Sequence, residues 1–254
     1  MHIRLLRHAA LVVSMHGQEI LVDPMLSPAG AMDPVANAGN DRRIPLVDLP
    51  LTESELQTLL NQVGAVLVTH NHRDHWDAYA REHLNKDKPI LCQAGDEEAI
   101  RQAGFTSVTP IATEYAWQGI TLYRTDGAHG TGEIEKKMGH VSGFILRAAG
   151  EPALYIAGDT IWCPAVNQAI QNYRPDVVVV NAGQAQFLTG DPITMSAGDV
   201  GAVCRAAPQA IVIAVHMETV NHCGLTREML RTYLAEQGLA AQVHIPADGD
   251  TLTF

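Results

Sequence analysis

Short runs of apolar, often β-branched residues recur along the whole of the 254-residue chain. Each run is bounded by polar or turn-forming residues, which is the pattern of a buried β-strand. Strands are predicted at residues 10–13, 19–22, 65–69, 90–93, 120–124, 141–146, 153–157, 176–181, 210–215 and 242–245. A chain with strands spread so evenly needs a fold in which sheets form most of the core.

Helical patterns lie between several of these strands. Apolar residues at positions 56, 59, 60 and 63 follow the spacing of one helix face, and Thr52 with Glu55 supplies a capping box before them. Further helices are predicted at residues 166–173 after Pro164, 200–207 after Ser196 and Asp199, and 226–237 before Gly238. Strands interleaved with helices predict a layered α/β architecture, with one sheet or two.

Composition narrows the class of protein. Hydrophobic residues make up 46% and charged residues 18%, an ordinary globular balance, and no linker-like stretch divides residues 1–254, so one domain is expected. The net charge of -11 disfavours nucleic acid as a partner. The chain has neither a membrane-length apolar run nor an apolar signal core, which predicts a cytoplasmic protein without a membrane partner. A small-molecule substrate is expected, and a homo-oligomer stays open.

The densest chemical signal follows the strand at 65–69. His70, His72, Asp74 and His75 place three imidazoles and a carboxylate within six residues. In extended backbone the side chains at i and i+2 point the same way, so His70 and His72 can bind one ion, while Asp74 and His75 are displaced and can bind a second. The alternative is a polar loop in which Asp74 caps the following helix.

The segment 69–75, Thr-His-Asn-His-Arg-Asp-His, resembles the signature loop of the metallo-β-lactamase superfamily, and later residues occur in that family's order. His129 in a glycine-rich loop, Asp159 after the strand at 153–157 and His216 after the strand at 210–215 match its further ligands. The resemblance implies an αββα sandwich of two mixed sheets flanked by helices, with metals at one edge. It implies one ion on His70, His72 and His129, a second on Asp74, His75 and His216, and Asp159 bridging both.

Supporting residues are predicted on weaker grounds. Asp23, before Pro24, resembles a turn that supports the metal site in relatives, although a simple turn fits equally well. His222 competes with His216 as a ligand, and strand-end placement favours His216, which leaves Glu218, Asn221 and His222 as outer-shell or substrate-contact candidates or as an exposed loop. The remaining histidines are interpreted as surface or packing residues: His2, His8, His16, His83, His140 and His244. The segment 27–50 reads as a long functional loop.

The resemblance and the ligand types together predict a metal-dependent hydrolase. One or two divalent ions are expected, zinc first and manganese or iron next. The ions would generate a metal-bound hydroxide, with catalytic roles for Asp74 and Asp159, and Asp159 would orient this nucleophile. Within the superfamily, the features near Asp23 and at residues 46–50 are similar to the ascorbate-6-phosphate lactonase branch. The predicted substrate is a small soluble ester or lactone, ahead of a phosphodiester. The alternative is a non-hydrolytic metal protein or a di-iron redox protein on the same fold, whose relatives carry glutamate where this chain has His72.

Overall fold

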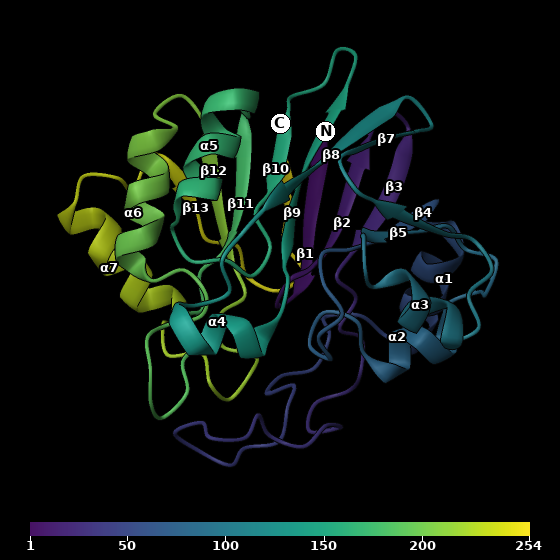
Figure 1. Ribbon diagram of the computed structural model, residues 1–254, viewed down its shortest axis with the longest axis horizontal. Helices are drawn as coiled ribbons and strands as arrows, with labels where there is room; N and C mark the ends of the chain where they lie inside the picture. The colour runs from purple at the N-terminus through teal and green to yellow at the C-terminus, as the bar shows by residue number, and fades with distance from the viewer.

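The computed structural model describes residues 1–254 and contains two seven-stranded sheets that face each other (Figure 1). The first sheet has the order β14 (Thr251–Thr253), β1 (His2–Arg7), β2 (Ala10–Met15), β3 (Gln18–Val22), β4 (Ala65–Val68), β5 (Ile90–Gln93) and β6 (Val108–Ile111). The second has the order β13 (Val243–His244), β12 (Ile211–Val215), β11 (Val177–Asn181), β10 (Leu154–Ile156), β9 (Ser142–Ala148), β8 (Ile120–Asp126) and β7 (Glu114–Trp117). Each sheet contains both parallel and antiparallel pairs.

Helices cover the outer face of each sheet (Figure 1). The first sheet carries α1 (Glu53–Gln62), α2 (Ala78–His83) and α3 (Glu97–Gln102), and the second carries α5 (Pro164–Tyr173), α6 (Ala197–Ala206) and α7 (Arg227–Glu236). The short helix α4 (Gly132–Met138) lies at the bottom edge in the view of Figure 1. The predicted αββα sandwich is therefore confirmed.

Three apolar clusters hold these layers together. The central cluster joins the inner faces of the two sheets, with Leu67 of β4 and Phe144 of β9 both fully buried. A second cluster packs the first sheet against α1, α2 and α3, and a third packs the second sheet against α5, α6 and α7. Burial on both faces explains the continuously apolar sequence of strands such as β11, which reads Val-Val-Val-Val-Asn.

The predicted strands and helices are all present, and the local signals act as expected. At the start of α1 the Thr52 side chain accepts a hydrogen bond from the Glu55 backbone N–H, and the Glu55 carboxylate accepts one from the Thr52 backbone N–H. The same reciprocal pair forms between Ser196 and Asp199 at α6. Each pair satisfies backbone N–H groups that the first turn of a helix leaves free.

Six elements were not predicted: β1, β6, β7, β14, α3 and α4. Three of the four missed strands are at sheet edges, where one side of the strand is open and the apolar pattern is weak. Pro110 in β6 is acceptable only because that strand is an edge. The missed strand β1 has a larger consequence, because it ends beside the site described below.

The topology brings the ends of five strands to one edge of the sandwich. Strands β1, β4, β8, β10 and β12 all end at the edge that carries α4 in Figure 1. The predicted long loop, residues 27–50, contains no helix or strand and runs below this edge (Figure 1). Loops at the carboxyl ends of strands are the usual place for a site in α/β proteins.

No helix of the structure has both the length and the apolar character that crossing a membrane requires.

Candidate metal centre

In the loop after β4, a turn and the N-cap of helix α2 fix the positions of the polar residues. Asp77, not Asp74, is the N-cap of α2, and its carboxylate accepts a hydrogen bond from Ala80 N at 2.8 Å. The same carboxylate accepts three more bonds from Leu26 N, Ser27 N and Ser27 Oγ, all within 2.7 Å. The alternative reading of Asp74 as a helix cap is therefore wrong, and its carboxylate is available to the histidine cluster.

His70, His72 and His129 form the first group of donors, with their nitrogen atoms within 4.8 Å of one another. His129 comes from the loop between β8 and α4, and its Nδ1 lies 2.7 Å from the Ile193 carbonyl oxygen. A carbonyl can only accept, so Nδ1 carries the proton and Nε2 presents its lone pair. By the same argument the Nε2 of His72 donates to the Met138 carbonyl at 3.0 Å and its Nδ1 faces the group.

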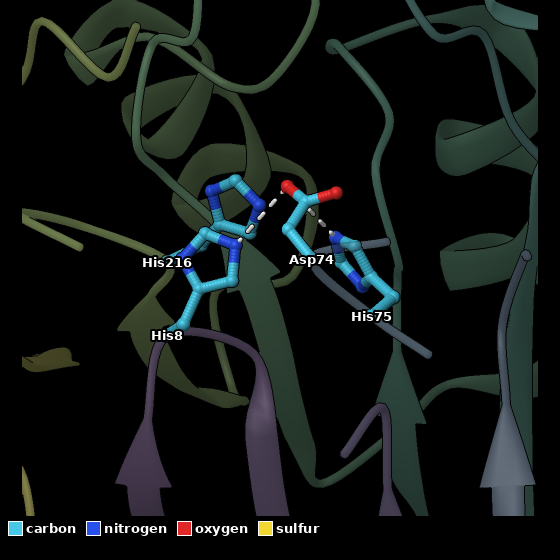
Figure 2. A group of neighbouring side chains, drawn as sticks. All are labelled: His8, Asp74, His75 and His216. Carbon is cyan, nitrogen blue, oxygen red and sulfur yellow. Dashed lines mark ion pairs between the residues drawn. The ribbon is translucent and has the colours of Figure 1, made fainter. Parts of the chain in front are cut away.

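His75 and His216 belong to a second group, which also contains Asp74 and His8 (Figure 2). The Nδ1 of His75 lies 2.8 Å from an Asp23 carboxylate oxygen, so its Nε2 is directed into the cluster. His216 follows β12, and its Nε2 lies 3.3 Å from Asp159 Oδ1. The side chains of His75 and His216 are both at most 1% exposed.

Asp159 lies between the two groups. It follows β10, and its Oδ2 is 3.6 Å from the Nε2 of His129 in the first group and 3.2 Å from the Nε2 of His75 in the second. The Asn181 side-chain amide donates to Oδ1 at 2.7 Å and fixes the carboxylate. Asp159 therefore lies within reach of both groups, and the bridging role that the family resemblance implied for it stays a prediction.

The charges of the cluster follow from burial and from these contacts. Burial would raise the pKa of Asp159, but the neighbouring imidazoles of His216 and His75 hold it well below its ordinary value. Burial would lower the pKa of His75, but Asp159 and Asp23 outweigh burial and raise it well above normal. Burial lowers the pKa of His129 to about 4, so this imidazole is neutral at pH 7. Metal ions bind neutral imidazoles and ionised carboxylates, so His129 and Asp159 are already in the binding form, whereas His75 would release a proton when an ion binds.

A metal ion fits the donors that the structure assembles. The Nε2 atoms of His75, His129 and His216 and both ring nitrogens of His8 are buried without a hydrogen-bond partner. Buried polar atoms are normally paired, and leaving one unpaired costs about 1–3 kcal/mol. Donor atoms that each lie about 2.0–2.2 Å from one ion are at most about 4.4 Å apart, and the contacts with Asp159 given above meet that limit.

His8 is the residue that the sequence analysis missed. It was interpreted as a surface or packing residue, whereas its side chain is fully buried and its Nε2 lies 3.4 Å from Asp74 Oδ2. Burial lowers its pKa to about 3, and the nearby His216 adds to that effect. The available signal was the two-residue interval between β1 and β2, which becomes a hairpin turn at the site edge once β1 is recognised.

The weaker predictions separate into distinct roles. Asp23 accepts hydrogen bonds from Thr69 N and Thr69 Oγ1, both at 2.7 Å, in addition to its contact with His75. Asn221 binds the long loop, accepting from Val35 N at 2.8 Å. Glu218 does not reach the cluster, because its carboxylate accepts from Arg227 on α7.

A cavity of about 210 Å³ opens onto the cluster. Four of the polar donors line it, and so does His222, whose ring stacks on Phe187 with centroids 5.8 Å apart. The apolar part of the wall consists of Val35, Ala36, Met138 and Phe187. Larger hollows of about 510 and 500 Å³ elsewhere contain none of the clustered residues. The long loop therefore contributes to the cavity wall through residues 35 and 36.

Replacing Asp23 with asparagine is expected to weaken the binding of the ion held by His75 by about 10- to 100-fold. Asparagine keeps the left-handed backbone of this position, where φ is 43°, but its amide offers a donor where the His75 N–H needs an acceptor. Isothermal titration of the metal-free variant with Zn²⁺ measures the effect. Asp33→Asn is the matched control, because Asp33 is exposed and pairs with Arg43. Equal affinities in the two variants would refute this role.

Comparison with known proteins agrees with this geometry. Residues 18–217 match the family described as Beta-lactamase superfamily domain. The chain is 36% identical to the UPF0173 protein YddR of Bacillus subtilis, over 100% of both chains. It is 26% identical to a UPF0173 metal-dependent hydrolase of Methylobacterium nodulans, over 97% of both.

Two solved structures resemble the chain along nearly its whole length. A possible metal-dependent hydrolase from Veillonella parvula is 35% identical, with a TM-score of 0.95, and the alignment covers 100% of this chain and 99% of that one. An isothiocyanate hydrolase from Delia radicum gut bacteria is also 35% identical, with a TM-score of 0.93 and the same coverage. Both structures resemble this chain closely enough to share its architecture.

Proposed function

The chain belongs to the β-lactamase superfamily domain family and is a metal-dependent hydrolase of the metallo-β-lactamase fold, and we propose that it hydrolyses a small uncharged substrate at an electrophilic carbon. The observation that carries this proposal is the small, partly apolar cavity that opens onto Asp159, His72 and His129. Its volume of about 210 Å³ accommodates a small molecule only.

Cations around the cavity are already engaged, which favours an uncharged substrate. Arg73 lines the cavity, but its guanidinium donates to the carbonyl oxygens of Asp33 and Pro34 at 2.8 and 3.0 Å. Farther out, Arg43 pairs with Asp33 and Lys136 pairs with Glu133. Divalent ions could compensate the charge of a phosphodiester, so its lower rank rests on the small, partly apolar cavity and on the absence of a further free cation there.

Each side chain of the site has a role that follows from its position. A divalent ion held here would lower the pKa of water towards about 7 and polarise the electrophile. Asp159 and Asp74 stay ionised because their pKa values are held well below normal, so they accept hydrogen bonds from water and orient it. His222 lines the cavity with a buried and unpartnered Nδ1, which suits it to contact a heteroatom of the substrate. Zinc is the first candidate metal for this set of nitrogen and oxygen donors, with manganese or iron next.

An isothiocyanate is the first candidate substrate, and an ester or lactone, which the sequence favoured, is the second. The support for the isothiocyanate is the 35% identity to the isothiocyanate hydrolase from Delia radicum gut bacteria. In that reaction the oxygen of water bonds to the central carbon, the carbon–nitrogen bond breaks, and nitrogen gains both protons, so R–N=C=S and H₂O give R–NH₂ and COS. An ester or lactone presents an electrophilic carbon of the same kind to the site.

A substrate panel on the metal-loaded protein tests the proposal. The panel contains benzyl isothiocyanate, sugar and acyl lactones, a p-nitrophenyl ester, a thioester, a β-lactam and bis(p-nitrophenyl) phosphate. We expect release of benzylamine and COS, slower turnover of esters or lactones, and no turnover of the phosphodiester. Turnover of the phosphodiester alone would contradict the carbon-centred proposal. No turnover of any compound by fully loaded protein would favour the non-hydrolytic metal or redox alternative.

A further inference from the structure

The backbone of His8 has a conformation that is unfavourable for a residue other than glycine. His8 lies in the two-residue turn between β1 and β2, with a left-handed backbone at φ 62°. The His8 carbonyl accepts a hydrogen bond from the backbone N–H of His216 at 2.9 Å, so the turn joins the ends of β1 and β12 across the two sheets. This bond places the two imidazoles side by side, with ring centroids 3.6 Å apart.

The imidazole of His8 satisfies none of its hydrogen-bonding capacity within the protein. The residue has no exposed surface, and neither ring nitrogen has a hydrogen-bond partner. A histidine that served only for packing would leave Nδ1 unpaired, at a cost of about 1–3 kcal/mol, and would leave Nε2 with only a long contact to Asp74. Its Nε2 is directed towards Asp74 Oδ2 at 3.4 Å (Figure 2).

We propose that His8 is a fourth protein ligand of the metal position formed by Asp74, His75 and His216. The ligand atoms of these residues lie within 4.8 Å of one another, and Asp74 Oδ2 is 3.4 Å from the Nε2 of His8 and 4.0 Å from the Nε2 of His75, both within the span of about 4.4 Å that one ion allows. The position is then surrounded by four protein donors in addition to the shared Asp159. With Asp159 included, this position has five protein donors and the position of His70, His72 and His129 has four.

The cavity supports this difference between the two positions. His72 and His129 of the first position line the cavity, whereas of the second position only Asp74 does, and His8, His75 and His216 are at most 1% exposed. The more protein ligands an ion has, the less room it keeps for water or substrate, so the position with fewer protein ligands is the one suited to bind them. An ion in the enclosed position would hold Asp74 and Asp159 in place and add positive charge to the site, and an ion in the position facing the cavity would be the one that water and substrate can reach.

Metal titration tests the proposal without measuring catalysis, so it does not depend on the proposed substrate. Metal-free wild type, His8→Gln and His16→Gln are titrated with Co²⁺ by calorimetry and by visible absorption. His16 is the matched control, because it lies in the next hairpin turn with φ 51° but is exposed and outside the cluster. We expect His8→Gln to weaken one of two binding steps by about 100-fold or more, to change the absorption of that ion, and to leave the other step intact.

Wild-type affinities and spectra in His8→Gln would overturn the proposal. The proposal would also be overturned if the wild type binds a single ion and His8→Gln binds that ion with the same affinity. If His8→Gln does not fold, a measurement on the wild type alone still tests the proposal. Proton NMR of the Co²⁺-loaded protein is expected to show one more paramagnetically shifted imidazole N–H signal than a ligand set without His8 supplies, and a count that matches the smaller set refutes the proposal.

Discussion

Replacing His216 with alanine is expected to remove an ion and to lower turnover by about 1,000-fold or more. The Nε2 of His216 is buried 3.3 Å from Asp159 Oδ1 and has no hydrogen-bond partner. Losing the ion removes several kcal/mol of charge stabilisation from the transition state, and each 1.4 kcal/mol corresponds to about a factor of ten in rate. Metal content by elemental analysis and kcat/KM on an active substrate measure the two effects.

The matched control is His222→Ala, in the same segment after β12. His222 lines the cavity but belongs to neither group of donors, so this variant should keep its metal and lose only about 10- to 100-fold in kcat/KM. Thermal unfolding of both variants shows whether they are folded. The opposite ranking, with metal lost in His222→Ala and kept in His216→Ala, would make His222 the ligand.

Removing the metal from the wild type is expected to abolish turnover and to lower Tm by about 10 °C. Ions bound only by the folded state contribute about 4 kcal/mol at a thousand times their dissociation constant, and 1 kcal/mol shifts Tm by about 2–4 °C in a domain of this size. Chelation and dialysis, followed by calorimetry and assay, measure both losses. Adding Zn²⁺ or Mn²⁺ should restore both. Turnover that survives complete chelation would exclude the metal mechanism.

The sequence predicts the central strands well because their apolar pattern has a single physical cause. Strands such as β4 and β11 are buried on both faces, so nearly every residue is apolar. Edge strands such as β7 alternate between exposed and half-buried residues and include Glu114, so they resemble loops. The six-residue helices α2 and α3 are too short to show a full apolar repeat.

The candidate site is predictable only where its residues are close in sequence. His70, His72, Asp74 and His75 form a local pattern whose density points to a metal without any alignment. His129 and Asp159 are ordinary in isolation and were identified through the family order. His8 belongs to no such pattern, and its role depends on β1 ending beside β12, which is a property of the sheet topology.

The central claim is that this histidine and aspartate cluster holds metal ions, and elemental analysis of the purified protein tests it most directly. The protein is purified under reducing conditions from cells grown in medium supplemented with zinc, manganese and iron. The cluster predicts between about one and two equivalents of transition metal per chain, with zinc predominant, and chelation should remove it. Less than about a tenth of an equivalent in folded protein would contradict the claim.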